Sequence, residues 1–353
     1  MIKKLTKEAI ELLKVLIETP SFSSEENETA THIERWLRAH QIPSQRNNNN
    51  VWATNKCFDA SKPTLLLNSH HDTVKPNNGY TKNPFKVYEE NGKLYGLGSN
   101  DAGGCLVSLL STFCYFYNQE NLNYNLVIVA SAEEESSGAN GLNSMLPFIP
   151  HIDVAIVGEP TQMHLAVAEK GLLVFDAVVK GTPSHAAHPN DDNPIYNTIE
   201  VLNWFKDFKF DKSSEVLGDV KMTVTQINAG KQHNAVPAAV ELVIDVRVND
   251  KYSNEDILEI LEKQAPCKVT PRSLNLNSSS IPISHPLVQA GLSLGRQTYG
   301  SPTLSDQAVL NCPSLKLGPG DSTRSHTADE FIYISEIEEG IKIYIKLLEK
   351  AIK

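Results

Sequence analysis

The chain is poor in the features that mark secreted, nucleic-acid-binding and membrane proteins. Its 353 residues include only five cysteines, scattered and never in a CxxC pair, which argues against disulfides or cysteine-bound zinc and is typical of a cytoplasmic protein. Lys and Arg number 32 against 42 Asp and Glu, without a basic run, so we expect no nucleic-acid partner. Apolar runs such as LVIVASA fall far short of the roughly 17–25 residues that span a bilayer, so we expect no membrane partner.

The sequence does contain an alternation of apolar runs and helical patterns. The apolar runs lie at 64–68, 126–131 and 154–157, and the helical stretches between them include 102–118 and 139–146. Such alternation predicts a parallel sheet that is covered by helices.

The first fifty residues add three local predictions. An amphipathic helix is expected over 4–18, ending before Pro20. Ser23 followed by Glu26 has the spacing of a capping box for a second helix. The NNNN run at 47–50 is interpreted as a turn between strands, because asparagine tolerates turn geometry.

From about residue 171 the pattern becomes that of an α+β domain. GLLVFDAVVKG alternates as a half-buried strand does, and it is followed by a helix near 193–208, strands near 219–229 and 239–248, and a helix near 253–263. This is a βαββαβ order, an antiparallel layer with helices on one face. Helices near 286–298 and 335–351 return to the first domain. We therefore expect a first domain in two parts, 1–170 and 276–353, with a second domain, 171–275, inserted between them.

Five polar clusters follow predicted strands or lie in loops. They are SHHD (69–72), GSNDAGG (98–104), SAEEESSG (131–138), VGEPT (157–161) and RSHTADE (324–330). Histidines with carboxylates and without cysteines form a ligand set that suits a catalytic zinc or a related divalent ion.

Each cluster also has an ordinary structural interpretation. The His-His-Asp stretch could be a hydrogen-bonded turn, the carboxylates at 133–135 a solvated helix start, Asp101 a helix cap, Glu159 a turn residue and His326 a surface residue. However, LVIVASAEEE places three carboxylates at the end of a buried strand, where like charges repel unless a cation neutralises them. Together the clusters favour a metal site.

The order of the five motifs resembles the dinuclear-zinc peptidase and deacylase family that contains acetylornithine deacetylase, succinyl-diaminopimelate desuccinylase, glutamate carboxypeptidase and aminoacylase. The resemblance covers essentially the whole chain. It implies an α/β fold with a zinc-exopeptidase-like mixed sheet flanked by helices and an inserted α+β lid and dimerisation domain. It also implies a metal-dependent amidohydrolase with two divalent metal ions, most simply zinc, with cobalt or manganese as alternatives.

The resemblance implies a role for each cluster. HHDTV matches the family's first motif, which makes His70 a metal ligand and Asp72 the group that orients its imidazole. Asp101 would bridge both metals, and Glu134 would be the general base. Glu159 would join His70 on one metal. Glu135 and His326 would hold the other metal. The sequence departs from the family's motifs at two places. Glu133 replaces the commoner aspartate, and GSNDAGG lacks the Asp-Met-Lys-Gly sequence of acetylornithine deacetylases.

The inserted domain carries three further candidates by the same resemblance. In dimeric relatives the histidine that matches His185 reaches the substrate carbonyl from the partner subunit, and His188 is its competitor three residues on. Asn234 in NAVP would contact substrate. Arg247 in DVRV would clamp a substrate carboxylate or make a structural ion pair. A homodimer through this lid domain is therefore expected.

The GPGDS stretch supplies the last candidates, Gly318 and Gly320, which resemble the family's substrate-side loop. As a serine nucleophile GPGDS lacks the strand–elbow pattern. GLGSNDAGG fails as a dinucleotide motif, because Asp101 occupies the place of the third glycine.

The expected substrate is a small N-acyl amino acid. The preferred reaction is that of acetylornithine deacetylase, on N-acetyl or N-succinyl ornithine or citrulline in arginine biosynthesis. Succinyl-diaminopimelate desuccinylase and a metallo-dipeptidase or carboxypeptidase are alternatives within the enzyme class. A non-catalytic amino-acid-binding protein is the alternative outside it, and the presence of Glu134 beside a full ligand set argues against that function.

Overall fold

The computed structural model describes residues 2–353. The chain forms two compact units: the first comprises Met1–Val167, Ser280–Tyr299 and Ser305–Lys353, and the second comprises Ala168–Ser279 and Gly300–Leu304. Within the described residues, no helix combines the length and the apolar character that crossing a bilayer requires.

The first unit is built on a mixed sheet. Seven of the nine strands of this sheet are, in spatial order, β1 (Gln45–Asn47), β2 (Asn50–Thr54), β6 (Asn125–Ser131), β3 (Thr64–His70), β7 (Val154–Val157), β17 (Ser314–Lys316) and β8 (Leu165–Glu169). The four central strands β6, β3, β7 and β17 are parallel to one another, while β1, β2 and β8 pair antiparallel. The predicted α/β class with a mixed sheet is therefore confirmed.

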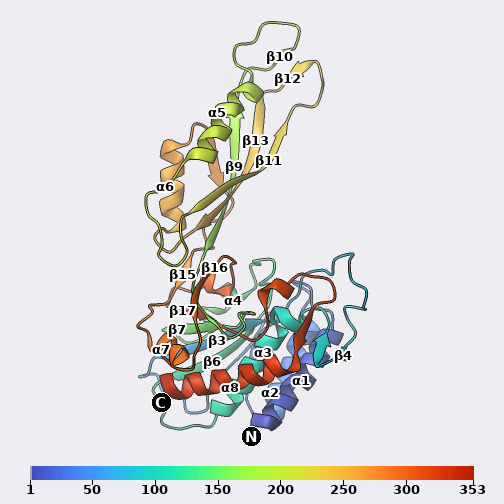
Figure 1. Ribbon diagram of the computed structural model, residues 1–353, viewed down its shortest axis with the longest axis vertical. Coiled ribbons are helices and arrows are strands. Elements are labelled where there is room, and N and C mark those ends of the chain that lie inside the picture. Colours follow the sequence, from blue (N-terminus) through green and yellow to red (C-terminus); the bar gives the residue numbers. More distant parts are fainter. Residues whose placement is uncertain (1) are drawn as a thin grey trace. The chain divides into compact units, whose positions relative to one another are not determined.

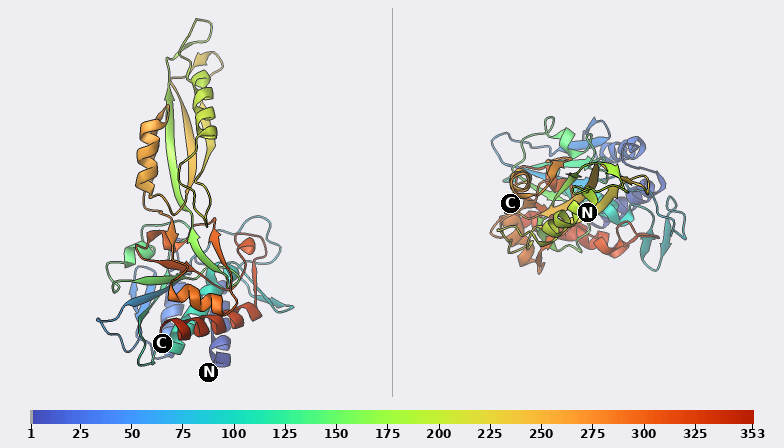
Figure 2. Two further views of the ribbon diagram at one scale, coloured as in Figure 1. Left: turned by 60° about the vertical axis from the view of Figure 1, so that its left-hand side comes forward. Right: turned by 90° about the horizontal axis from the view of Figure 1, so that it is seen from above.

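Alternate residues of the central strands face opposite layers of helices. Leu65 and Leu67 belong to a large core with α1 (Ile2–Glu18), α2 (Asn27–Ala39), α3 (Gly104–Phe116), α7 (Pro286–Ser293) and α8 (Ile334–Ala351). Leu66 and Val127 face a smaller core with the short α4 (Leu142–Met145), which is less than the helix predicted over 139–146. Helices α7 and α8 lie side by side (Figure 2). The central strands are buried on both faces, which explains their continuous apolar runs.

Short elements complete this unit. A three-stranded sheet is formed by β4 (Tyr88–Glu90), β5 (Lys93–Tyr95) and β18 (Phe331–Tyr333). Three helical turns are η1 (Ser99–Gly103), η2 (Asp306–Val309) and η3 (Ser322–Arg324). Strands β15 (Ser279–Ser280) and β16 (Thr298–Ser301) lie where the chain passes between the units.

The capping prediction for the second helix is wrong. Helix α2 begins at Asn27, with Glu26 at the N-cap position and no side-chain capping hydrogen bond. The hydroxyl of Ser23 donates instead to the carboxylate of Asp72, over 2.7 Å. By contrast the asparagine turn is confirmed, since Asn48 adopts a φ of 53° between the paired strands β1 and β2.

The second unit has the predicted βαββαβ order. Its elements are β9 (Gly171–Lys180), α5 (Pro194–Asp207), β11 (Lys221–Ala229), β13 (Ala239–Val248), α6 (Asn254–Gln264) and β14 (Lys268–Pro271), with a small ribbon of β10 (Ser184–His185) and β12 (Ala235–Val236). The sheet is antiparallel in the order β11-β13-β9-β14. Alternate residues of β9 and β13 share one core with both helices, so α5 and α6 cover the same face (Figure 1).

Candidate metal centre

The candidate ligands gather at the carboxyl edge of the parallel strands. His70 is the last residue of β3, the carboxylates of 133–135 follow β6, and Glu159 follows β7. These three strands are neighbours in the sheet. Asp101 lies in η1 and His326 follows η3. Ligands of open α/β sheets bind outside the carboxyl ends of the strands, and the described residues place all five candidate metal ligands there.

The five side chains form two groups that share Asp101. His70, Asp101 and Glu159 make one group, and Asp101, Glu135 and His326 make the other, with the ligand atoms of each group within 4.8 Å of one another. Oδ1 of Asp101 lies 3.4 Å from Nε2 of His70. Oδ2 of Asp101 lies 3.6 Å from Nε2 of His326. Asp101 therefore presents one oxygen to each group, which is the arrangement of a bridging carboxylate.

The His70 imidazole is oriented as a metal ligand is. Its Nδ1 lies 3.0 Å from the backbone carbonyl of Asp72, to which it must donate. Its Nε2 is buried and has no hydrogen-bond partner among the described residues, although Glu159 Oε1 lies 3.8 Å away. A buried nitrogen lone pair directed at carboxylates fits a divalent cation, because a cation would satisfy the nitrogen and both acids together.

Burial makes the charge of this site unfavourable without a cation. Burial, reinforced by Asp101, raises the pKa of Glu159 to about 8. Burial also raises the pKa of Glu134 well above its usual range, and the neighbouring Glu159 adds to the effect. For His70 burial alone would lower the pKa, but the carboxylates of Asp101 and Asp72 raise it well above its ordinary value. The raised pKa values indicate that added positive charge is favourable at this site, which suits a divalent cation.

Glu134 is fixed through its backbone, whereas its carboxylate makes no hydrogen bond within the described residues. Its backbone N–H donates to Asp72 Oδ1 over 3.1 Å, and the N–H of Glu135 donates to Asp72 Oδ2 over 3.1 Å. In the described chain no hydrogen bond or ion pair engages the Glu134 carboxylate itself. Asp72 therefore holds the backbone on which Glu134 stands, while the acid remains available for proton transfer.

The comparisons with known proteins agree with this geometry. Residues 66–350 match Peptidase family M20/M25/M40. The chain belongs to this family. It is 26% identical to a succinyl-diaminopimelate desuccinylase of Rickettsia bellii (strain RML369-C), over 95% of both chains, and 29% identical to an acetylornithine deacetylase of Proteus mirabilis (strain HI4320), over 96% of both. Its fold matches a dinuclear metal-binding peptidase of the M20 family from Bacillus subtilis with a TM-score of 0.75, at 16% identity over 98% of each chain.

Membership of the M20 family identifies the chain as a hydrolase, as the sequence predicted. The local structure excludes two of the non-metal interpretations, those of Asp101 as a helix cap and of 133–135 as a helix start. Asp101 does not cap α3, whose N-cap is Gly103 without a side-chain hydrogen bond. The carboxylates at 133–135 start no helix, since 133 lies in a bend and 134 to 137 form a turn.

The second unit of this M20 chain brings two of its candidates together. His185 and Asn234 are exposed, and the backbone N–H of Ala186 donates to the backbone carbonyl of Asn234 over 3.0 Å. Nδ1 of His185 accepts from the N–H of Ala187. The ring of His188 lies 5.8 Å from that of His185, so the two competing histidines occupy the same end of the unit.

Arg247 is engaged within its own strand. Its Nε and Nη2 donate to the two carboxylate oxygens of Asp245 over 2.9 and 3.0 Å. This is the structural ion pair that the sequence left open, and it occupies the Nε–Nη2 edge of the guanidinium. A contact between Arg247 and a substrate carboxylate stays a prediction.

Gly318 and Gly320 allow two segments to approach closely at the metal centre. A Cβ on Gly318 would lie 2.6 Å from the backbone oxygen of Glu159, and Gly320 has a φ of 93° with the Asn100 side chain 2.5 Å from its would-be Cβ. The carbonyl of Gly318 also accepts the N–H of Thr161. These glycines pack the segments beside Glu159 and Asp101 against each other.

Glu330 is a residue at this centre whose role the sequence did not reveal. It is buried, and its carboxylate accepts the backbone N–H groups of Gly98, Asn100 and Asp101 over 3.1, 2.8 and 2.9 Å. Burial, reinforced by Asp101, raises the pKa of Glu330 to about 8. Its position in the RSHTADE cluster, four residues after His326, was the available signal, but nothing in the spacing indicates three backbone donors.

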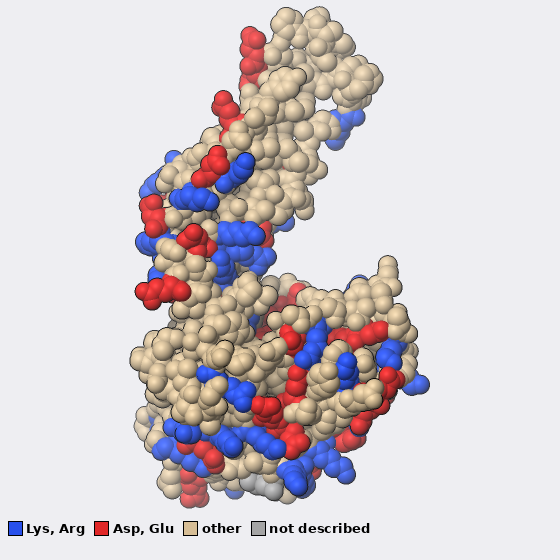
Figure 3. All heavy atoms as spheres, viewed as in Figure 1, with Lys and Arg blue, Asp and Glu red and all other residues tan. Residues whose placement is uncertain are grey.

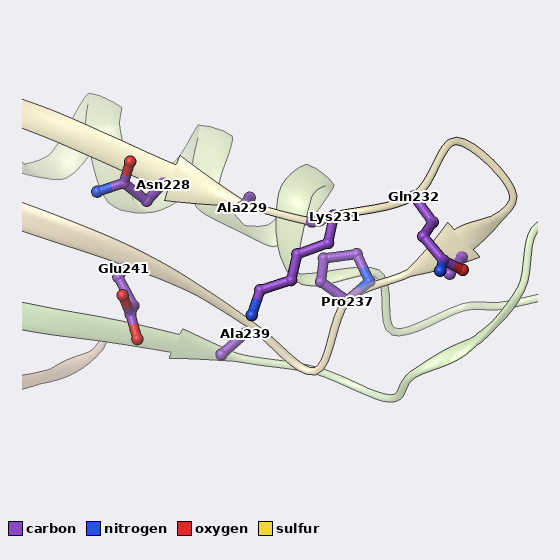
Figure 4. Close-up of a pocket in the computed structure, with 9 residues that line it drawn as sticks. Asn228, Ala229, Lys231, Gln232, Pro237, Ala239 and Glu241 are labelled. Atoms are coloured by element: carbon purple, nitrogen blue, oxygen red, sulfur yellow. The ribbon is translucent and has the colours of Figure 1, made fainter.

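Two cavities accompany these sites. One of about 300 Å³ in the first unit is lined by Pro160 and Thr161, which follow Glu159, and by Asp321. The other, of about 520 Å³, lies in the second unit, where Lys231 extends toward the strand that carries Ala239 and Glu241 (Figure 4). Basic and acidic side chains are intermixed over the face shown in Figure 3, with no basic stripe on it.

Proposed function

We propose that this M20-family protein hydrolyses the amide bond of a small N-acyl amino acid with the help of two divalent metal ions. The observation that carries the proposal is the division of the two Asp101 oxygens between His70 and His326. The half-buried Glu134, whose carboxylate makes no hydrogen bond in the described chain, lies beside them. His70, Asp101 and Glu159 are proposed to hold one ion, and Asp101, Glu135 and His326 the other. Histidine and carboxylate ligands favour zinc, with cobalt or manganese as alternatives.

The metal ions would supply Lewis acidity, which lowers the pKa of water and polarises a carbonyl. The chain supplies the proton transfer. We assign Glu134 as the general base that takes a proton from the attacking water and then returns it to the departing amine. A base near neutrality suits this exchange, and burial places the pKa of Glu134 above its usual range. Asp72 orients His70 and holds the backbone of Glu134.

For the second unit we propose substrate contact and dimerisation. His185 and Asn234 would reach the substrate carbonyl and acyl group, and His185 would donate to the oxyanion that develops there. Helix α5 exposes Ile195, Tyr196 and Ile199, of which Tyr196 is 70% exposed, and this apolar surface favours a homodimer through the unit. The variant Ile199→Lys should shift a dimer toward monomer in light scattering, and a wild-type monomer at micromolar concentration would contradict the dimer.

The substrate is proposed to be N-acetylornithine or a close N-acetyl or N-succinyl analogue, in arginine biosynthesis. The identity to an acetylornithine deacetylase favours this choice, and the similar identity to a succinyl-diaminopimelate desuccinylase supports that activity as the second candidate. The cavity of about 300 Å³ that follows Glu159 lies at the carboxyl edge of β7 and β17. We propose that it holds part of the substrate, since clefts of this size and position bind small ligands.

One experiment tests the activity and the base together. Zinc-loaded wild-type protein and Glu134→Ala are assayed against N-acetylornithine, N-acetylcitrulline, their N-succinyl counterparts, succinyl-diaminopimelate and a few dipeptides. We expect wild-type turnover of at least one N-acyl amino acid, and a fall of kcat by more than about 100-fold in Glu134→Ala with unchanged zinc content. Full turnover by Glu134→Ala would refute the base, and wild-type cleavage of dipeptides alone would refute the deacylase.

A further inference from the structure

The turn that carries the proposed base has an unusual hydrogen-bond pattern. Four consecutive backbone N–H groups, those of 132 to 135, donate to side-chain oxygens from other parts of the chain. Ala132 donates to Asn50 Oδ1 over 2.9 Å and Glu133 donates to Glu26 Oε1 over 3.1 Å. The next two N–H groups donate to the two oxygens of Asp72. The backbone of the turn is therefore held by side chains rather than by a strand or a helix.

Ser23 and Glu26 connect these acceptors to the segment before α2. The Ser23 hydroxyl donates to Asp72 Oδ2 over 2.7 Å, on the same oxygen that accepts the N–H of Glu135. Glu26 is fully buried, and it also accepts the N–H of Ser24 and the side-chain amide of Asn49. The pair that resembles a capping box thus supports the turn instead of the helix.

The turn needs this support because its backbone is strained. Glu133 has a φ of 54°, a left-handed conformation that costs a residue with a Cβ on the order of 1 kcal/mol. The carboxylate of Glu133 is itself fixed by Ser24 Oγ and by Asn140. Since the Glu134 carboxylate makes no hydrogen bond in the described chain, only the backbone fixes where that acid lies. A change in the turn therefore moves the base directly.

We propose that Ser23, Glu26 and Asn50 are positioning residues for Glu134, and we name the three together the turn clamp. Ser23 acts through Asp72, while Glu26 and Asn50 act on the two residues that precede Glu134. None of the three lies in either ligand group, so the turn clamp affects the base without providing a metal ligand. This inference rests on the proposed role of Glu134.

The test compares Ser23→Ala and Glu26→Gln with the conservative Ser23→Thr and with Glu25→Gln. Glu25 is exposed and is the neighbour of Glu26, so it provides a matched loss of charge. In Glu26→Gln an amide NH₂ replaces one carboxylate oxygen and faces a donor, which leaves at least one donor unpaired. Steady-state rates are measured on the acyl amino acid that the wild type hydrolyses fastest, together with zinc content, Tm and hydrogen–deuterium exchange of the peptide that contains 132–136.

We expect kcat to fall by about 10- to 100-fold in Ser23→Ala and in Glu26→Gln, since a displacement of about 1 Å can cost about 100-fold. KM and zinc content should stay at wild-type values, Ser23→Thr should recover most of kcat, and Glu25→Gln should match the wild type. Exchange of the 132–136 peptide should be faster in Ser23→Ala and unchanged in Glu25→Gln.

Two outcomes overturn the turn clamp. One is wild-type kcat and wild-type exchange in Ser23→Ala. The other is a loss of kcat that follows an equal loss of zinc or Tm, which would make the role merely structural. Failure of the proposed function looks different, because Glu134→Ala would then be as active as the wild type, or the wild type would be inactive. The exchange measurement still decides the turn clamp in that case.

Discussion

The two ligand groups of the metal centre differ most in their histidines. The side chain of His70 is 1% exposed, whereas that of His326 is 54% exposed, although the two groups share Asp101. His70 ends a central strand, where neighbouring strands hold it on both sides. His326 stands in a loop with a φ of 58° and is tied by its carbonyl to the Asn77 side chain. One group is thus built into the sheet and the other is attached to a surface loop.

This difference has a chemical counterpart. The hydrogen bond to Glu135 raises the pKa of His326 to about 9, and the Nε2 of His326 lies 2.9 Å from Glu135 Oε2. A metal that enters this group must therefore displace a proton from an ion pair that solvent can reach. A metal at His70 must also displace a proton, because Asp101 and Asp72 raise the pKa of that imidazole well above its ordinary value. However, no hydrogen bond has to be broken at its buried Nε2. We expect the His70 group to be preformed and the His326 group to bind its ion more weakly.

Removing each histidine should give the largest contrast. His70→Ala should lower zinc affinity by more than about 100-fold, because even residues that only orient ligands contribute about 10- to 100-fold. His326→Ala should lose only one of the two ions. Zinc per chain, measured by elemental analysis after dialysis, checks both variants, and an equal loss in the two would remove the distinction between the groups.

When a chelator removes zinc from the wild type, the His326 group should lose its ion before the His70 group does, and the difference between the groups should be smaller than in the histidine variants. An ion held by an exposed histidine is open to attack by a chelator, so zinc release should occur in two phases, with the His326 group first. A colorimetric zinc indicator follows the release, and His326→Ala should lack the fast phase. A single phase that is the same in wild type and variant would show that the two ions leave together.

The pH dependence of the metal-free protein should give the smallest effect. Glu159 and Glu330 have folded pKa values raised to about 8 from an ordinary 4.5, so they favour the folded state below their ordinary pKa and lose that contribution as pH rises toward 8. His326, whose pKa is raised to about 9 from 6.5, loses its contribution as pH rises from about 6.5 to about 9, a range that overlaps with that of the two glutamates. All three groups stabilise the folded state less as pH rises, so Tm should fall as pH rises from about 5 to about 8.

Zinc and one variant provide the controls for that pH profile. Bound zinc should flatten it, because the cation neutralises the carboxylates that raise the pKa of Glu330. Glu330→Gln should flatten it without zinc, because one of the titrating acids is gone. Differential scanning fluorimetry measures both profiles, and a metal-free Tm that increases from pH 5 to pH 8 would contradict the charge assignment.

The sheet and the ligand set were accessible from the sequence for a physical reason. Strands buried on both faces must be continuous apolar runs, as 64–68 and 126–131 are, and the residue types that follow them mark the functional edge. Parallel neighbours bring their carboxyl ends together whatever their separation in sequence. His70 and Glu135 could therefore be expected at one place without knowledge of the side-chain geometry.

The supporting contacts were not accessible in the same way. Ser23 and Glu26 have the spacing of a capping box, but the tertiary contacts with Asp72 and Glu133 replaced the local ones. Arg247 finds Asp245 on its own strand, a choice that a pattern of residue types does not determine. Glu330 recognises backbone N–H groups, which every residue has, so no sequence signal marks its partners.

The hydrogen bonds of the 132–135 turn have a consequence for folding. Its acceptors come from Glu26, Asn50 and Asp72, so the turn acquires its shape only after the first helices, the N-terminal hairpin and the central strand have docked. Local sequence alone cannot stabilise a left-handed glutamate. Hydrolytic competence should consequently emerge last during refolding, after most of the secondary structure has already formed.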